Sequence, residues 1–247
     1  MISRDCRVIF VHQRKSAGTS VKALFPDAAG ADRGRLNDGL LEADWDAPEF
    51  AGWYRFTVVR NPWDRFVSAW NYCRSTRRRP ILDVIENLPM PDMRDNVFAP
   101  RQSLRARATY AVDVLRLEWA GKATPERLGH DYRHIARQQW ESVIRPDGSL
   151  AVDRVVFFED LAAGLAAVFA DIGRPMPALP GHKVKRAGDD YRRHFDDRAR
   201  AAFERVFARD IAAWGYDFES GRPSWPPSGA GPRGQAPISS SVDATSA

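Results

Sequence analysis

Three short, continuous apolar runs constrain the fold of this chain more than any other feature of its sequence. They occupy residues 8–11, 56–59 and 155–158, and β-branched and aromatic residues dominate them. Runs of this length and composition, each followed by polar residues, predict β-strands. Because apolar residues do not alternate with polar ones, both faces of each strand are expected to be covered, as in a parallel sheet.

Helical patterns follow the predicted strands. Asn61 and Pro62 form the kind of pair that caps and opens a helix, and this helix is expected to continue to about Arg77. Other helices are expected over residues 100–121, 161–173 and about 203–214. Strands that alternate with helices predict an α/β fold, with a central, mostly parallel β-sheet flanked by α-helices.

The length and composition of the chain fit one domain followed by a tail. Of its 247 residues 44% are hydrophobic, which is enough for a sizeable core. Residues 1–218 are expected to form the domain, and residues 219–247, rich in Pro, Gly and Ser, a flexible tail.

Several classes of protein are disfavoured by the same composition. No apolar run approaches the ~20 residues of a membrane-spanning helix, so no membrane span is expected. The chain has only two cysteines, Cys6 and Cys73, which excludes a disulfide framework and favours a cytoplasmic protein. The net charge of +5 is mild, and no nucleic-acid partner is expected.

The residues after the first apolar run have the composition of a phosphate-binding loop. Lys15 is followed by Gly18, Thr19 and Ser20, where a helix is expected to begin. Glycine lets an anion approach the backbone, and hydroxyl groups and the first N–H groups of a helix can donate to it. The segment is not a Walker A loop, because Lys15 stands three residues before Gly18 and no glycine precedes it. Taken alone, the pattern is equally compatible with an ordinary strand–turn–helix junction.

Arg60 and Ser68 form a second candidate anion site. Arg60 follows the second run, at the carboxyl end of a strand, where open α/β sheets bind ligands. Ser68 lies seven residues after Asn61, about two helical turns, and so returns to the same face of the helix. We therefore expect the two side chains to hold one phosphate group between them.

Together these segments resemble the sulfotransferase superfamily, most closely its carbohydrate-sulfotransferase branch. The first motif of that family, close to H-x-P-K-[TS]-[AG]-G-T-[ST], stands here as residues 12–20, with Arg14 in place of the proline. The second, V-R-[ND]-P-[WY]-[DE]-R-x-x-S, stands here as residues 59–68. The resemblance extends over most of the chain, with further similar segments near Gln139 and Asp210.

The resemblance implies a P-loop NTPase-like sulfotransferase fold and the donor 3′-phosphoadenosine 5′-phosphosulfate (PAPS). By position, the 5′-phosphosulfate would be bound by Lys15, Ser16, Ala17, Gly18, Thr19 and Ser20. Arg60 and Ser68 would bind the 3′-phosphate, the group that distinguishes PAPS from ATP. Lys15 would also neutralise charge on the bridging oxygen as the S–O bond breaks. No metal is implied, and no cluster with metal-ligand spacing stands in the sequence.

The acceptor and the general base stay open. The implied acceptor is a hydroxyl group, with a carbohydrate favoured by the branch and a small-molecule alcohol or phenol as the alternative. His134 and Glu42 are the candidate catalytic residues that would take its proton, although a structural role is more common for a helical histidine such as His134. A small ATP-dependent kinase and a non-catalytic nucleotide-binding relative are the other interpretations, and the oligomeric state is not predicted.

Overall fold

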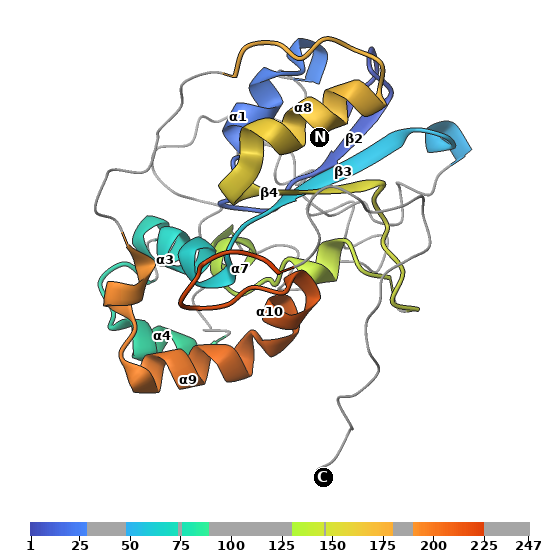
Figure 1. The fold of residues 1–247 in the computed structure, drawn as a ribbon. Helices are drawn as coiled ribbons and strands as arrows, with labels where there is room; N and C mark the ends of the chain where they lie inside the picture. Colours follow the sequence, from blue (N-terminus) through green and yellow to red (C-terminus); the bar gives the residue numbers. More distant parts are fainter. Residues whose placement is uncertain (29–47, 74–75, 89–129, 146, 180–189, 225–247) are drawn as a thin grey trace, which may run out of the picture.

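A four-stranded sheet forms the centre of the structure, a computed structural model that describes residues 1–28, 48–73, 76–88, 130–145, 147–179 and 190–224 (Figure 1). In order across the sheet, the strands are β1 (Ile2–Ser3), β2 (Val8–Val11), β3 (Tyr54–Val59) and β4 (Arg154–Phe157). β2 pairs with β3, and β3 with β4, in parallel, whereas β1 is antiparallel to β2. The predicted α/β fold with a mostly parallel sheet is confirmed.

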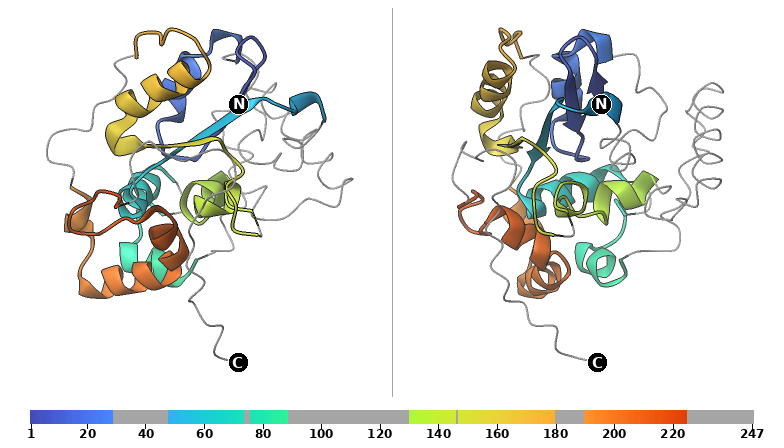
Figure 2. Two further views of the ribbon diagram at one scale, coloured as in Figure 1. Left: turned by 45° about the vertical axis from the view of Figure 1, so that its right-hand side comes forward. Right: turned by 90° about the vertical axis from the view of Figure 1, so that its right-hand side faces the viewer.

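Helices lie against one face of this sheet and beyond the carboxyl ends of its parallel strands (Figure 2). On one side are α1 (Gly18–Ala23) and α8 (Leu161–Asp171). Beyond the carboxyl ends of the parallel strands, and packed into a second core cluster, are α3 (Pro62–Tyr72), α4 (Ile81–Glu86), α7 (His130–Ile135), α9 (Asp197–Val206) and α10 (Ala208–Trp214). Short 3-10 turns are formed by Pro26–Ala28, Pro48–Phe50, Trp140–Ser142, Phe158–Asp160 and Tyr191–His194.

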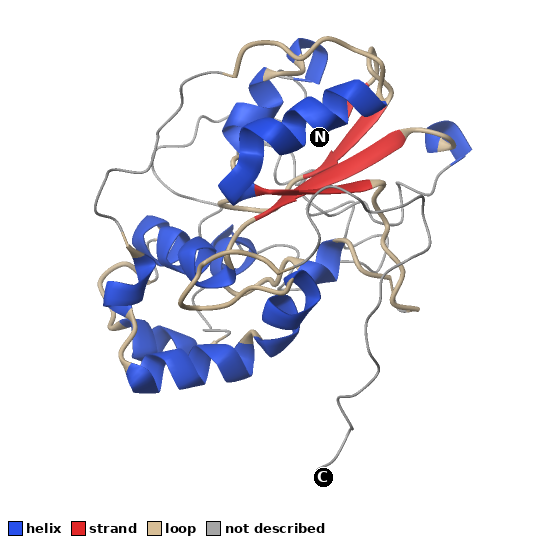
Figure 3. Ribbon diagram, in the orientation of Figure 1, coloured by secondary structure: helices blue, strands red, loops and turns tan. Residues whose placement is uncertain are grey.

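Packing on both faces of the sheet, drawn in red in Figure 3, explains why the apolar runs are continuous. In β2, Val8 and Phe10 pack in the core cluster that contains α1 and α8. Ile9 and Val11 pack in the cluster on the opposite side. Successive side chains of a strand point to opposite faces, so a strand covered on both faces needs apolar residues at every position. Phe158, expected to end the third strand, instead begins a 3-10 turn.

The predicted start of α3 is confirmed, but its predicted end is wrong. Asn61 is the N-cap, and its side-chain oxygen accepts a hydrogen bond of 3.0 Å from the N–H of Asp64. The helix ends at Tyr72 rather than near Arg77, because Cys73 adopts an extended backbone with ψ of 138°.

The helix expected over about 203–214 is in fact two helices. α9 ends at Val206 and α10 begins at Ala208, with Phe207 between them in a non-helical conformation (φ −105°, ψ 18°). Val206, the last residue of α9, is 38% exposed. α10 ends at Gly215 as expected, and the φ of 63° there suits glycine.

Two predicted segments lie wholly or mostly outside the described residues. They are the helix over 100–121 and the C-terminal tail. The described chain continues past the predicted domain boundary at Phe218 as far as Ser224. There Arg222 pairs with Asp160 at 3.1 Å, so the first residues of the predicted tail contact the domain.

Candidate functional site

The carboxyl ends of β2 and β3 lie side by side, because the two strands are parallel neighbours. The register pairs Val11 with Thr57, and the hydroxyl of Thr57 donates to the carbonyl oxygen of Val11 at 2.7 Å. β2 leads into the β2–α1 loop (residues 12–17), and β3 leads into Arg60. The sheet thus brings the two sequence motifs to one edge, where open α/β folds bind ligands.

The β2–α1 loop is held in an uncommon backbone conformation. Lys15 and Ala17 have φ of 68° and 58°, in the left-handed region that is unfavourable for residues other than glycine. Ser16, between them, is fully buried, and its hydroxyl donates to Oε1 of Gln139 at 3.4 Å. The side chain of Ser16 therefore faces the interior, whereas that of Thr19, at the start of α1, is exposed.

Gly18 is required by a close contact with the ring of His12. A Cβ at Gly18 would lie 1.8 Å from Nε2 of His12. The imidazole is fixed in turn against Phe10, with ring centroids 5.5 Å apart. Gly18, which the sequence predicts to let an anion approach the backbone, thus also leaves room for the ring of His12.

Arg60 is buried and reaches across to the β2–α1 loop. Its Nη1 donates to the carbonyl oxygen of Lys15 at 2.8 Å. Its Nε and Nη2 both lie 2.9 Å from Oδ2 of Asp64, one helical turn further on. The guanidinium carbon lies 4.4 Å from the ring centroid of Phe158. The pairing of Asp64 with Arg60 was not predicted from the sequence.

Ser68 lies on α3 and is half-buried. Among the described residues, no hydrogen bond joins its hydroxyl to Arg60; the guanidinium is held by Asp64 and by the carbonyl of Lys15. The proposed pairing of Arg60 and Ser68 around one phosphate stays a prediction.

Tyr72, in the last turn of α3, contacts two of the catalytic candidates. Nζ of Lys15 lies 3.9 Å from the centroid of the Tyr72 ring. The buried ring of His134, on α7, lies 5.0 Å from the same centroid. The structure therefore brings Lys15 and His134 to one aromatic side chain that is 52% exposed. Tyr72 was not predicted from the sequence, although its place one turn after Ser68 puts it on the same helix face.

Gln139 connects Arg60 to the β2–α1 loop. It is fully buried, and it exchanges two hydrogen bonds of 2.9 Å with the backbone N–H and carbonyl of Arg60. Its own carbonyl accepts a bond of 3.3 Å from Nε2 of Gln13. Asp210 on α10, also fully buried, accepts from the backbone N–H of Gln139 at 2.8 Å and from its Nε2 at 3.3 Å. One amide side chain thus links both motifs to the C-terminal helices.

Glu159 supports the other side of the start of α3. Its carboxylate accepts from the N–H of Asn61 at 2.9 Å and from the hydroxyl of Tyr216 at 2.7 Å. Burial raises the pKa of the Glu159 carboxyl. The pKa of Tyr216 is also raised, first by burial and then by the neighbouring carboxylate of Glu159.

Within the described ranges, no group of three or more His, Cys, Asp and Glu side chains could hold a metal ion. No helix in the same ranges is long and apolar enough to cross a membrane. Glu42, the second candidate base, lies outside the described residues.

A comparison with models of protein families matches residues 1–216 of the chain to the sulfotransferase family. This chain belongs to that family. Comparisons with curated proteins and with solved structures gave no match. The matched range of the sulfotransferase contains the β2–α1 loop, Arg60, Gln139 and Asp210.

The charges at the sheet edge suit a sulfotransferase, because the transferred group and its donor are anionic. Lys15 and Arg60 bring two positive charges to this edge. The carboxylate of Asp64 pairs with Arg60 at 2.9 Å and fixes its orientation. A guanidinium held in this way is preorganised to bind an oxyanion.

Proposed function

We propose that this sulfotransferase takes its sulfuryl group from PAPS and transfers it to a hydroxyl group, with a carbohydrate as the favoured acceptor. One contact carries the proposal: Nη1 of Arg60 donates to the carbonyl oxygen of Lys15 at 2.8 Å. It keeps the residue expected to bind the 3′-phosphate beside the residue expected to bind the 5′-phosphosulfate. PAPS carries both groups on one ribose, whereas ATP has no 3′-phosphate.

The residues present fit such a donor. A guanidinium has five N–H donors, and three of those of Arg60 bond to Asp64 and the carbonyl of Lys15. One N–H on each terminal nitrogen of Arg60 is then left for a phosphate oxygen, as far as the described residues show. The hydroxyls of Thr19 and Ser20, exposed and half-buried at the start of α1, supply further donors beside Lys15.

The side chains at this site would then each have a chemical role in sulfuryl transfer. PAPS supplies a sulfuryl group on a phosphate leaving group; the bond from the acceptor oxygen to sulfur forms as the bond from sulfur to the phosphate oxygen breaks. Lys15 stabilises the negative charge that develops on that phosphate oxygen. His134 or Glu42 takes the proton of the acceptor hydroxyl. Tyr72 touches both Lys15 and His134, and so fixes their separation.

Calorimetric titration of the purified chain with 3′,5′-adenosine bisphosphate, the desulfated donor, tests the proposal. ATP with Mg²⁺ is the comparison ligand. We expect clear preference for the bisphosphate, because only it presents a 3′-phosphate to Arg60. A Lys15→Ala variant should keep most of this binding and lose turnover once an acceptor is supplied.

Two results would count against the proposal. Preference for ATP with Mg²⁺ would favour a kinase. Binding of neither nucleotide would indicate a relative that retains the fold without the donor site.

A further inference from the structure

The chain continues past the range matched to the family and folds back onto the domain, in red after α10 in Figure 1. We name this segment, residues 217–224, the C-terminal strap. Its end is fixed at Ser224, whose backbone N–H and hydroxyl donate to the carbonyl oxygen of Gly215 at 2.7 and 3.0 Å. Arg222 pairs with Asp160 at 3.1 Å, but both side chains are exposed, and an exposed ion pair contributes little to stability.

The middle of the strap contacts Asn61, the N-cap of α3, which is only 1% exposed. Nδ2 of Asn61 donates to the carbonyl oxygen of Gly221 at 3.3 Å and to the hydroxyl of Tyr191 at 3.4 Å. The hydroxyl of Tyr191 donates in turn to the carbonyl oxygen of Phe218. The two N–H groups of the Asn61 amide are therefore bound by the strap and by a side chain that is itself bonded to the strap.

The oxygen of the Asn61 amide faces the helix and connects the strap to Arg60. Oδ1 accepts a hydrogen bond of 3.0 Å from the N–H of Asp64. The carboxylate of Asp64 holds Nε and Nη2 of Arg60, both at 2.9 Å. If the amide turned over, its N–H groups would face the N–H of Asp64, and all three bonds of the amide would be lost. The strap thus selects one orientation of Asn61 and, through Asp64, fixes the direction of the Arg60 guanidinium.

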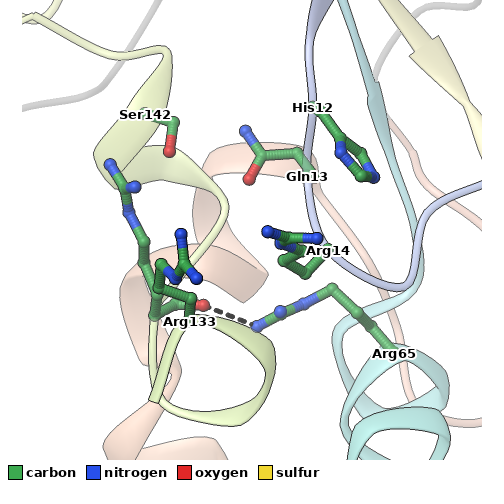
Figure 4. Close-up of a pocket in the computed structure, with 7 residues that line it drawn as sticks. His12, Gln13, Arg14, Arg65, Arg133 and Ser142 are labelled. Atoms are coloured by element: carbon green, nitrogen blue, oxygen red, sulfur yellow. Dashed lines mark hydrogen bonds between the residues drawn. The ribbon is translucent and has the colours of Figure 1, made fainter. Parts of the chain in front are cut away.

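Other contacts hold the backbone of this region. Gln139 bonds to the N–H and the carbonyl oxygen of Arg60. Arg65 anchors α3 itself, because its buried side chain extends from α3 toward α7 and donates to two backbone carbonyls (Figure 4). These carbonyls belong to His134 and Arg137, at 3.2 and 2.8 Å. Loss of the strap contacts would therefore leave the backbone of Arg60 in place and loosen its side chain.

We infer that the C-terminal strap is a positioning element of the donor site, which orients the guanidinium of Arg60 for the 3′-phosphate. The inference rests on the proposed function, and it assigns a role to residues that follow the matched range of the family. Tyr191 and Gly221 are the positioning residues that connect the strap to Asn61. Gly221 has φ of 66°, and a Cβ there would lie 3.1 Å from the hydroxyl of Tyr191, so a larger residue would displace this contact.

Titrations of the full chain with 3′,5′-adenosine bisphosphate and with adenosine 5′-phosphate test the strap. The ratio of the two affinities measures the contribution of the 3′-phosphate. Tyr191→Phe removes the hydroxyl that bonds to Asn61, and Gly221→Val displaces the carbonyl acceptor. Ordering one flexible side chain on binding corresponds to roughly two- to ten-fold in affinity. We expect each variant to weaken the bisphosphate by that factor and to leave the affinity for the 5′-phosphate unchanged.

Two matched variants make the same chemical changes away from the site. Tyr54→Phe removes a hydroxyl bonded to Asp171 at the start of β3, the end of the strand opposite to Arg60. Gly173→Val adds the same side chain at φ of 65°, where a Cβ would meet none of the described atoms within 4 Å. Both should leave the ratio of affinities unchanged. Circular dichroism identifies any variant that does not fold, and Tyr191→Phe tests the strap without the backbone strain of Gly221→Val.

The outcomes separate this inference from the proposed function. An unchanged ratio in Tyr191→Phe would overturn the inference, and an equal loss for the two nucleotides would leave the strap only a support of the fold. An equal change of the ratio in Tyr54→Phe or Gly173→Val would also contradict it, because these variants do not touch Asn61. If the unaltered chain shows no preference for the bisphosphate over the 5′-phosphate, the proposed function fails and the inference fails with it.

Discussion

Gln139 is the side chain through which the two motifs keep a fixed relation. Its amide bonds to the backbone of Arg60 on one side and to Asp210 on the other. Its carbonyl and Oε1 accept from Gln13 and Ser16 of the β2–α1 loop. The loop and Arg60 are therefore preorganised before any donor binds, which limits the entropy that binding must overcome.

Gln139→Leu should lower the free energy of unfolding by about 3 kcal/mol, since each buried polar group left without a partner costs ~1–3 kcal/mol. Urea denaturation measures the loss. The same variant should weaken binding of the bisphosphate, because Ser16 of the loop and the backbone of Arg60 lose their shared partner. Gln138→Leu is the control: its side chain is half-buried, bonds at the surface to the carbonyl of Val206 and to Trp140, and should cost less than about 1 kcal/mol. Equal losses in both variants would contradict the special role of Gln139.

Arg60→Gln should weaken PAPS by roughly ten- to a hundred-fold, the effect of losing a charge-assisted contact of ~1.5–3 kcal/mol. Adenosine 5′-phosphosulfate, which has no 3′-phosphate, should be affected far less. Direct titration with both ligands measures the difference. The double variant Arg60→Gln/Asp64→Asn removes the unpaired carboxylate and separates loss of binding from loss of folding. An equal loss for both ligands would exclude Arg60 as the 3′-phosphate residue.

Individual residues of the site were predictable where a local motif contains them. Lys15, Gly18 and Arg60 follow strand ends, and their chemical roles can be inferred from the neighbouring residues alone. Tyr72 and the role of Gln139 were not predictable in this way. Their partners are distant in sequence, and only the packing of α3 and α7 against the sheet brings them together.

Among the elements, α8 lies close to β4 because Gly164 has no side chain. A Cβ there would come within 2.4 Å of Cγ1 of Val156. Val156 is 1% exposed and β-branched, so its side chain has little freedom to move.

Gly164→Ala should therefore lower the free energy of unfolding by about 1–3 kcal/mol through overpacking. Helix propensity alone predicts the opposite effect, a rise of ~1 kcal/mol in the free energy of unfolding. Urea denaturation gives the sign directly, and a stabilised variant would show that the contact does not constrain α8. Ala166→Gly, on the exposed face of α8, should cost about 1 kcal/mol through propensity alone.

The elements differ in how much of each the sequence could predict. β2 coincides with its apolar run because charged and polar residues, Arg7 and His12, bound it on both sides. β1 has only two residues and is a strand only because it pairs with β2, so no apolar pattern in the sequence predicts it. The break at Phe207 was missed because apolar residues keep helical spacing across it.

At the scale of the whole molecule, buried and half-buried tyrosines make the free energy of unfolding depend on alkaline pH. Tyr54, Tyr191 and Tyr216 are three of the six tyrosines, and burial raises the pKa of each. They connect distant segments: Tyr54 donates to Asp171, Tyr191 to the carbonyl of Phe218, and Tyr216 to Glu159. In the unfolded chain a tyrosine loses its proton near pH ~10.

Because the pKa of these three tyrosines is raised in the folded state, the stability of the protein falls as the pH rises. The stability that they contribute is complete below about pH 10 and is lost as the pH rises through their folded pKa, because the unfolded chain then binds fewer protons. We expect their phenolate absorbance to appear only as circular dichroism reports unfolding. Ionisation of all six tyrosines near pH ~10 in a chain that stays folded would contradict this.

The bonds that join Asp210 to Gln139, and Gln139 to the β2–α1 loop and to Arg60, also set an order of events during synthesis. The ribosome completes the loop early, yet the residues that hold it are made much later. At about 5–20 residues per second, Asp210 is added roughly 10 to 40 seconds after Ser20. Throughout that interval the nascent chain carries the whole first motif without Asp210, the carboxylate that holds Gln139 in place, and it gains this support only when the last helices are released.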